Sequence, residues 1–438
     1  MGISADKVRT ILSRNILADG FTPIMDMNKS SGSYIIDEAT GDSYLDMFSM
    51  FASGSVGYNH PKILENKDLL ANVSLIKPTL SDLYNTYYAD FVDTFNKKAI
   101  PKYLPNAFFV EGGALAVENS LKAAFDWKIR KNLKKNIKNK GKQVIHFKQA
   151  FHGRSGYTLS LTNTTDSRKT MYFPKFNWPR VTNPYINFPL DENSTKEVIN
   201  RENASLNQIK NAIKNNLNDI AAIIIEPIQG EGGDNFFRDE FFVKLREICD
   251  ENDILFILDE VQTGIGITGK MWAHQYNSVK PDIICFAKKA QVGGILCSKR
   301  IEEVDNNVFT ESSRINSTFG GNLVDMIRFK IILEIIDEEN LLSNALDVGS
   351  YLKNKIDSLE QKYPAYITNS RNLGLWAAFN LPSMTERDAL LSEMMKNKLL
   401  ILPSGDRAIR FRPHLNVSKS HIDEAIDIIN NSIANCLK

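Results

Sequence analysis

The fold is decided by residues 254–264, which read ILFILDEVQTG. The five consecutive apolar residues Ile254–Leu258 predict a strand that is buried on both faces, as strands of parallel sheets are. This strand runs directly into Asp259, so the carboxylate lies at the carboxyl end of a sheet strand. Open α/β sheets bind their ligands at that edge. The stretch therefore predicts an α/β fold with a ligand site beside Asp259.

Similar short apolar runs lie on both sides of this stretch. They are Ala107–Val110, Val144–Lys148, Ile220–Ile225 and Ile283–Ala287. Between the runs, Leu115–Lys128 and Arg238–Glu251 place apolar residues at the three- and four-residue spacing of helices. Repeated alternation of strand and helix predicts a doubly wound α/β domain with a mostly parallel sheet.

The two ends of the sequence have a different pattern. Near the start we expect a hairpin, and after residue 322 we expect two long helices, a strand and a closing helix. These elements are Ser33–Ile36 with Ser43–Met47, residues 323–361, Leu375–Asn380 and His421–Cys436. We therefore expect a large cofactor domain over residues 51–324. A small α+β domain would be formed by residues 1–50 and 325–438.

Two polar stretches of the sequence predict loops. The first is Thr162–Leu206, and the second is the basic run Lys128–Lys142. The basic run lacks the interleaved aromatic residues of many nucleic-acid sites, so we interpret it as a solvated helix end.

Composition excludes several classes of protein. The 438 residues include 53 Lys and Arg against 52 Asp and Glu, and 43% are hydrophobic. This balance is typical of globular proteins and gives no overall attraction to nucleic acid or to anionic membranes. The four cysteines have no CxxC spacing, so neither a disulfide framework nor a metal cluster is expected. Without a signal peptide or a membrane span, we expect a cytoplasmic enzyme.

Three glycines resemble a nucleotide motif. Gly264-Ile-Gly266-Ile-Thr-Gly269 fits the GxGxxG pattern, but Asp259–Thr263 separates the strand from the glycines. Met271 also stands where a phosphate loop has Ser or Thr. These departures favour a flexible loop. A nucleotide-binding or ligand-sensing protein is the non-enzymatic alternative, and it would bind nucleotide without showing cofactor absorbance.

A lysine follows the next predicted strand, at the same edge of the sheet as Asp259. Lys288 or Lys289 would share a cavity with Asp259 and Val261, two residues that point the same way on an extended chain. Such a set suits pyridoxal 5′-phosphate (PLP). The lysine forms a Schiff base, the aspartate keeps the pyridine nitrogen protonated, and the aliphatic group packs on the ring. Glu111-Gly-Gly113-Ala114, before a helix, could hold the phosphate through backbone N–H groups.

Further motifs are distributed along the chain. They are Gly112-Gly-Ala-Leu-Ala-Val-Glu-Asn-Ser-Leu-Lys122, Phe151-His-Gly-Arg154, Glu226-Pro-Ile-Gln-Gly-Glu231, Asp259-Glu-Val-Gln-Thr-Gly264 with Lys288, Asn316-Ser-Thr318-Phe-Gly-Gly321 and Arg410-Phe-Arg-Pro. In this order they resemble the class III, fold-type I PLP-dependent aminotransferases over almost the whole chain. Within that class the sequence is most similar to the lysine 6-aminotransferase (lysine ε-aminotransferase) subfamily. Ala287 departs from the glycine that often precedes the lysine.

The resemblance implies contacts with the cofactor ring. Lys288 would be the Schiff-base lysine and the proton shuttle, and Asp259 would pair with the pyridine nitrogen. Val261 and Phe151 would pack on opposite faces of the ring. Gln262 would reach the phenolic oxygen of the cofactor and also face the substrate.

The resemblance also implies contacts with the cofactor phosphate. Gly113 and Ala114 would hold it together with Thr318 of the partner subunit, which requires a homodimer with shared active sites. His152 is expected to be a hydrogen-bonded scaffold residue, since Lys288 already serves as the base.

The implied reaction transfers the ε-amino group of L-lysine to 2-oxoglutarate by a ping-pong route, giving 2-aminoadipate 6-semialdehyde and L-glutamate. Arg154 would bind the carboxylate that lies far from the reacting carbon. Arg410 would bind the α-carboxylate of 2-oxoglutarate, with Arg412 as a rival for this role. Glu231 would mask Arg410 during the lysine half-reaction, because an unpaired buried charge is costly, and would swing away for 2-oxoglutarate.

Other reactions on the same scaffold stay open. Class III ω-aminotransferases that act on ornithine, 4-aminobutyrate or diaminobutyrate would use the same catalytic parts. One or two methylenes change the binding free energy of a substrate by only about 1–3 kcal/mol, so motifs do not separate these substrates. A PLP-dependent aminomutase or decarboxylase would need no stoichiometric keto acid.

Overall fold

A seven-stranded sheet is the largest element of the computed structural model, which describes residues 2–437. Its strand order is β3-β9-β8-β7-β6-β4-β5. The strands are β3 (Asn106–Val110), β4 (Gln143–Phe147), β5 (Arg180–Val181), β6 (Ile220–Ile225), β7 (Leu255–Asp259), β8 (Ile283–Phe286) and β9 (Gly293–Cys297). Neighbours from β8 to β5 are parallel, and β9 is antiparallel to both β8 and β3. Strand β3 therefore runs in the same direction as β8.

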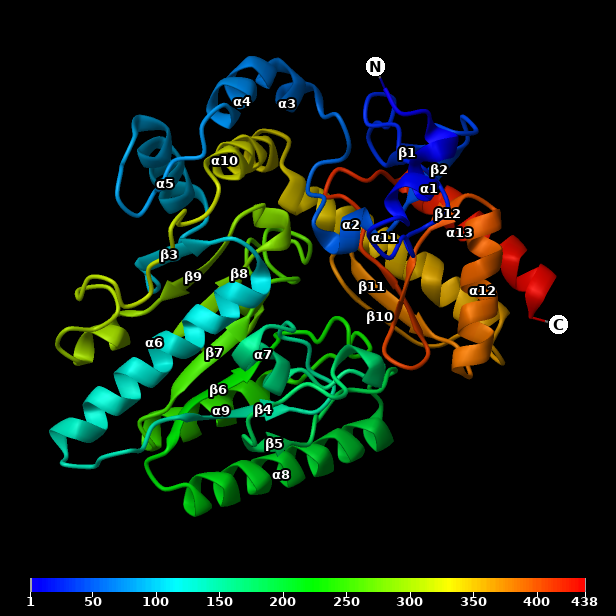
Figure 1. The fold of residues 1–438 in the computed structure, drawn as a ribbon. Coiled ribbons are helices and arrows are strands. Elements are labelled where there is room, and N and C mark those ends of the chain that lie inside the picture. The colour runs from blue at the N-terminus through cyan, green and yellow to red at the C-terminus, as the bar shows by residue number, and fades with distance from the viewer. Residues whose placement is uncertain (1, 438) are drawn as a thin grey trace.

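The sheet is apolar on both faces because helices cover both. Helix α6 (Gly113–Lys134) crosses one face, as Figure 1 shows, where Leu255 and Ile257 of β7 join its core. Phe256 and Leu258 join the opposite core together with apolar residues of α9 (Asp239–Glu251). This alternation explains why the central strands read as continuous apolar runs.

Two smaller sheets join segments that are far apart in sequence. An antiparallel sheet has the order β10 (Thr368–Leu373), β11 (Trp376–Asn380), β14 (Ala408–Phe411), β13 (Leu402–Ser404). The third sheet has the order β1 (Tyr34–Ile36), β2 (Ser43–Asp46), β12 (Leu399–Leu400), and Leu45 lies opposite Leu399 in a parallel pair. In Figure 1 the blue and the orange-red elements accordingly lie together. The boundaries at residues 51 and 324 stay a prediction.

The other helices surround these sheets. The α-helices are α1 (Val8–Leu12), α2 (Ser49–Ala52), α3 (Pro61–Glu65), α4 (Lys67–Ser74), α5 (Thr86–Lys98), α7 (Gly156–Leu161), α8 (Glu192–Asn215), α10 (Leu323–Glu338), α11 (Leu341–Lys362), α12 (Met384–Lys396) and α13 (Lys419–Cys436). The 3₁₀ turns are η1 (Ala5–Lys7), η2 (Ser167–Lys169), η3 (Ala273–Tyr276), η4 (Lys288–Ala290) and η5 (Lys299–Glu303). Within residues 2–437 every helix is too short or too polar to cross a membrane.

The loop predicted over Thr162–Leu206 is wrong in its last part. Helix α8 begins at Glu192, where the carboxylate of Asp191 accepts the backbone N–H of Ser194 at 2.8 Å. The helix buries only a sparse stripe that includes Val198 and Ile209. Because polar residues fill most of the other positions, the apolar periodicity is weak in the sequence.

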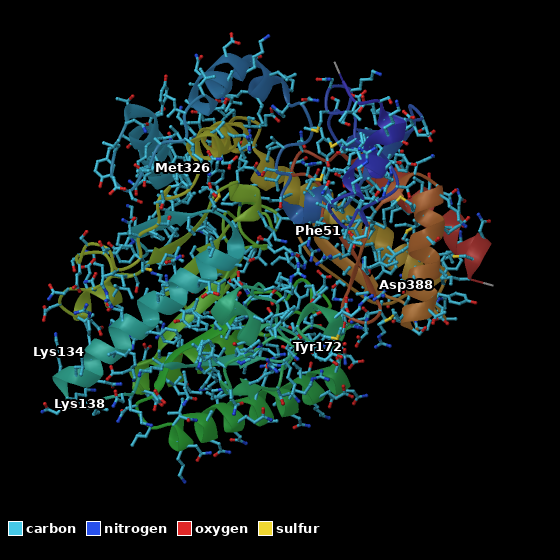
Figure 2. All side chains as sticks on the ribbon, viewed as in Figure 1. Phe51, Lys134, Lys138, Tyr172, Met326 and Asp388 are labelled. Atoms are coloured by element: carbon cyan, nitrogen blue, oxygen red, sulfur yellow. The ribbon has the colours of Figure 1, made fainter. Side chains whose placement is uncertain are left out.

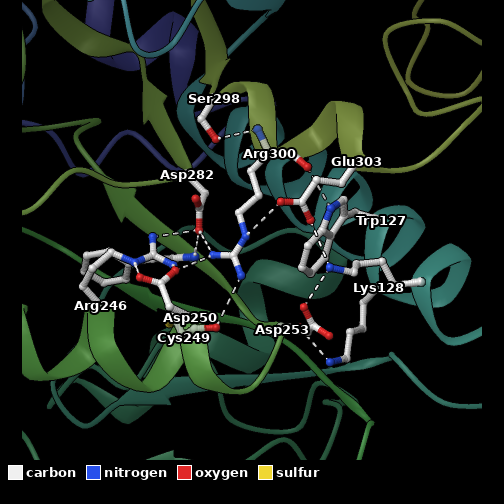
Figure 3. A network of polar contacts seen from close by, with 12 residues as sticks. Trp127, Lys128, Arg246, Cys249, Asp250, Asp253, Asp282, Ser298, Arg300 and Glu303 are labelled. Atoms are coloured by element: carbon white, nitrogen blue, oxygen red, sulfur yellow. Dashed lines mark hydrogen bonds and ion pairs between the residues drawn. The ribbon is translucent and has the colours of Figure 1, made fainter.

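The basic run Lys128–Lys142 contains the end of α6 at Lys134, and most of residues 133–142 are exposed, as predicted for a solvated helix end. Its first residue differs, because Lys128 is buried and anchored. Lys128 is 3% exposed, and its Nζ donates to the carbonyls of Asn252 and Asp253 at 3.1 and 2.7 Å. Burial lowers the pKa of Lys128 to about 8. Figure 3 shows the same network around Asp253 and Arg300, whose guanidinium lies 5.2 Å from the centre of the Trp127 ring. Lys128 therefore docks α6 against the end of α9, while the last part of the run is exposed to solvent.

Candidate active site

A cavity of about 560 Å³ lies where the parallel strands of the large sheet end. Lining residues follow β3, β4, β6 and β8, and Asp259 ends β7. Among those that follow the strands are Gly113, Phe151, Glu226 and Lys288. This is the edge at which open α/β sheets bind ligands. The cavity brings together these predicted site residues: Gly113, Ala114, Phe151, Arg154, Glu231, Asp259, Val261, Gln262 and Lys288.

The two neighbouring lysines have different environments. Lys288 lines the cavity, and its Nζ donates to the carbonyl of Phe51 at 2.9 Å. Lys289 is 1% exposed, and its Nζ donates to the carbonyl of Ala52 at 2.9 Å. Burial, aided by the positive charges of Arg410 and Arg412, lowers the pKa of Lys288 to about 7. The structure thus places Lys288, and not Lys289, at the cavity surface.

An unusual turn, α2, supports both lysines. Its four residues, Ser49 to Ala52, have φ values from 40° to 66°, in the left-handed region. For L-residues this conformation costs roughly 1–2 kcal/mol each. Besides the two lysines, the Nε2 of Gln291 donates to the carbonyl of the following residue, Ser53, at 3.0 Å. Phe51, labelled in Figure 2, is 55% exposed. No sequence motif indicated this turn.

The carboxylate of Asp259 is held in place by two donors. His152 Nδ1 lies 2.7 Å from its Oδ2, and the backbone N–H of Val261 donates to its Oδ1 at 3.0 Å. Burial opposes protonation of His152, but the hydrogen bond and the charge of Asp259 outweigh it and raise the pKa of the imidazole. His152 is thus hydrogen-bonded to Asp259, in agreement with the scaffold role expected for it.

Glu226 is a site residue to which sequence reasoning gave no role. Its carboxylate accepts the backbone N–H groups of Phe151 and Gly230, each at 3.0 Å. Burial raises the pKa of Glu226 to about 7, against the opposing charge of His152. The sequence did contain a signal for this residue. Glu226 directly follows β6, so it lies at the same edge of the sheet as Asp259, which ends β7.

The start of α6 is suited to an anion. Its N-cap Gly112 has φ 86°, and no side chain caps the helix, so backbone N–H groups stay available. A Cβ on Gly113 would meet Val261 Cγ1 at 2.7 Å, so only glycine allows this close approach. An anion site, an oriented carboxylate, an aliphatic side chain and the Lys288 amine in one cavity fit PLP.

The structure distinguishes Arg410 from Arg412. Arg412 is fully engaged: it pairs with Asp234, donates to the Phe411 carbonyl at 2.8 Å and lies 3.3 Å from the centre of the Trp376 ring. Arg410 is buried but forms no ion pair within residues 2–437, and its Nε has no partner there. Within the described residues, its side chain forms one hydrogen bond, from Nη1 to Gln262 Oε1 at 3.5 Å. Arg410 is therefore the arginine with donors left for a carboxylate.

The predicted ion pair between Glu231 and Arg410 is not formed. The Oε1 of Glu231 accepts the Thr164 hydroxyl at 2.8 Å and pairs with Lys169 instead. Two donors on the segment after α7 therefore compete successfully for this carboxylate. Arg154 is exposed at the cavity wall, and the structure of residues 2–437 gives its side chain no hydrogen bond or ion pair.

Thr318 is not brought to this cavity by its own chain. It is exposed, and its neighbours Asn316 and Gly320 line a separate cavity of about 400 Å³. The contact expected from the partner subunit stays a prediction.

Comparison with known proteins decides the family. The sequence matches the family described as "Aminotransferase class-III" over residues 17–433. The chain belongs to the class III aminotransferases. It is therefore a PLP-dependent enzyme, and the aminotransferase prediction is confirmed.

Relatives of this class III aminotransferase cover nearly its full length. It is 46% identical over 432 residues to the L-lysine-epsilon aminotransferase of Mycobacterium tuberculosis, a match that covers 98% of this chain and 95% of that protein. Identity to the L-lysine-epsilon aminotransferase of Streptomyces clavuligerus is 42% over 435 residues, with 98% and 95% covered. The solved structure of the lysine aminotransferase from M. tuberculosis superposes with a TM-score of 0.97 at 46% identity, over 99% of this chain and 100% of that one. The predicted fold-type I architecture is confirmed.

Proposed function

We propose that this aminotransferase moves the ε-amino group of L-lysine to 2-oxoglutarate and forms 2-aminoadipate 6-semialdehyde and L-glutamate. The observation behind the proposal is the Arg154 guanidinium, which shares a cavity with Lys288 and has no ion-pair partner within residues 2–437. When lysine reacts at its side-chain amine, its α-carboxylate lies far from the reacting carbon and suits such a guanidinium. The similarity to L-lysine-epsilon aminotransferases supports lysine as the donor.

The cavity residues would hold PLP at several points. Lys288 would bind it through Nζ, and the α6 start at Gly113 and Ala114 would receive its phosphate. Asp259, oriented by His152, would keep the pyridine nitrogen protonated. When bound, PLP draws electrons from the carbon that loses its proton.

Lys288 would move the proton. Because its pKa is lowered to about 7, about half of its Nζ groups are neutral at pH 7 and most are neutral above it. The neutral amine can take a proton from Cε of lysine. In the second half-reaction it returns a proton to the former keto carbon of 2-oxoglutarate. Arg154 would hold the distal carboxylate in both half-reactions, and Arg410 the α-carboxylate of 2-oxoglutarate.

The enzyme would work as a homodimer in which Thr318 of the partner subunit completes the phosphate site. Support comes from the exposed apolar side chains near Thr318, which are Leu75, Ile76, Leu83, Tyr84 and Phe319. The segment that contains Leu75 to Tyr84 is adjacent to the segment around Thr318, since the N–H of Leu80 donates to the carbonyl of Phe319 at 3.2 Å. Clustered exposed apolar residues are typical of protein interfaces.

A direct assay tests the proposed donor. Purified enzyme with PLP and 2-oxoglutarate is mixed separately with L-lysine, L-ornithine or 4-aminobutyrate, and glutamate is measured. We expect the fastest glutamate formation with lysine. Arg154→Met should lower kcat/KM for lysine about 10- to 100-fold, because a charge-assisted bidentate contact is lost. Turnover of another amine without turnover of lysine would refute the proposal.

A further inference from the structure

We propose that Lys169 is a positioning residue that holds Glu231 away from Arg410 and so keeps Arg410 open to the carboxylate of the acceptor keto acid. The proposal rests on the function proposed above, because it gives Lys169 a part in the 2-oxoglutarate half-reaction. It adds a residue that lies outside the cavity of Lys288.

The segment after α7 presents two donors to Glu231. The η2 turn begins after Asp166, whose carboxylate accepts the N–H of Arg168 at 3.2 Å. Lys169 ends this turn and pairs with Glu231 Oε1, the same oxygen that accepts the Thr164 hydroxyl at 2.8 Å. The Lys169 and Glu231 side chains are 33% and 20% exposed, so their attraction is less screened than that of a surface pair.

Arg410 competes for the same carboxylate. Lys169, Glu231 and Arg410 together line a second cavity of about 590 Å³, and Glu231 also lines the cavity of Lys288. Burial lowers the pKa of Arg410, while the negative charges of Asp234 and Glu231 act in the opposite direction. Glu231 thus shares a cavity with the two cations Lys169 and Arg410 and is paired with only Lys169.

The other cations of the second cavity do not compete for Glu231. Arg168 is held by the carboxylate of Asp166 at 2.8 and 3.0 Å. Arg387 pairs with Asp388 and donates to the carbonyls of Gly405 and Asp406. Lys169 is therefore the cation that decides where Glu231 rests.

Removing Lys169 should shift Glu231 toward an ion pair with Arg410. A buried guanidinium without a partner is unfavourable, so Arg410 would then attract Glu231. An incoming keto acid would have to displace Glu231, and its apparent affinity would fall in proportion to the fraction of open Arg410. Lysine places no carboxylate at Arg410, so its half-reaction should be little affected.

Binding of glutarate to the holoenzyme tests this role. Glutarate has the two carboxylates of 2-oxoglutarate but no keto group to react, and its Kd is measured by isothermal titration calorimetry. We expect Lys169→Met to raise the Kd about tenfold and Lys169→Arg to stay within about twofold of wild type. Lys175→Met is the matched control: its Nζ donates to the carbonyl of Thr170 at 3.1 Å, so it should leave the Kd unchanged.

A double variant separates positioning from a general loss of positive charge. Adding Glu231→Gln to Lys169→Met removes the competing carboxylate and should return the Kd for glutarate to within about threefold of wild type. Equal Kd values for Lys169→Met and wild type, or no recovery in the double variant, would overturn the proposal. If wild-type enzyme made no glutamate from lysine, the proposed function would fail, yet the glutarate series would still decide the role of Lys169.

Discussion

Lys288 and Lys289 show how one residue of sequence separates a reactive amine from a structural one. Lys288 Nζ is bonded to the Phe51 carbonyl at the cavity surface, whereas Lys289 Nζ is buried against Ala52. We expect Lys288→Ala to abolish the visible absorbance of covalently bound cofactor and the aminotransferase activity. Lys289→Met should keep that absorbance even if it lowers the melting temperature. Covalent absorbance that persists in Lys288→Ala would contradict the assignment.

The pH dependence of cofactor attachment follows from the same residue. The pKa of Lys288 is lowered to about 7 from its ordinary value, so the reactive neutral amine predominates above pH 7 and disappears below it. We expect the rate at which cofactor-free enzyme recombines with PLP to rise through about pH 7 and then level off.

A variant of Arg410 provides the control for this pH profile. After burial, the positive charge of Arg410 is the largest influence that lowers the pKa of Lys288. Arg410→Leu should therefore move the rising limb of the recombination rate to higher pH. The electrostatic explanation would be refuted by a limb that does not move.

At the scale of elements, the phosphate site proposed at the start of α6 can be tested through its glycine. A Cβ at Gly113 would meet the stiff, β-branched Val261 at 2.7 Å, whereas a Cβ at Gly156, the start of α7, would meet nothing closer than 3.7 Å. Gly113→Ala should therefore raise the Kd for PLP about tenfold by displacing the anion site. Gly156→Ala should leave the Kd unchanged in the same fluorescence titration. Equal Kd values for both variants would refute the proposed phosphate site.

The sequence predicted those elements that bury apolar residues without interruption. Ile220–Ile225 is a strand over its full predicted length, and the predicted strand Ile254–Leu258 is shifted by one residue in β7. Strand β9 was missed because it begins with Gly293 and Gly294, which weaken a strand pattern. Helix α8 was missed because few of its residues are buried.

The candidate site was predictable to the extent that its residues follow strands. Asp259 and Lys288 meet in one cavity because parallel strands end at one edge of the sheet. The contact of Lys169 with Glu231 was not predictable, since it joins two irregular segments whose relative position depends on tertiary packing. Glu231 was predicted to lie near Arg410, but its pairing with Lys169 was not predicted, and neither was the charge of Asp234 near Arg410.

At the scale of the whole molecule, complementation tests the proposed dimer. If Thr318 of the partner subunit completes each site, Lys288→Ala and Thr318→Arg subunits should each be inactive alone. In a random mixture, half of the dimers are mixed, and one of their two sites has both native residues. We expect about a quarter of wild-type activity after subunit exchange. No recovery, although mixed dimers form, would exclude shared sites.

The parallel pairing of β2 with β12 has a consequence for the order of folding. All strands of the large sheet lie between Asn106 and Cys297, so this sheet can form while the rest of the chain is still being synthesised. Leu45 leaves the ribosome long before its partner Leu399. The hairpin β1-β2 therefore lacks its third strand, β12, until residue 399 has been synthesised. The first strands to be made are thus among the last to be completed, and a chaperone would find their unpaired edge exposed throughout most of translation.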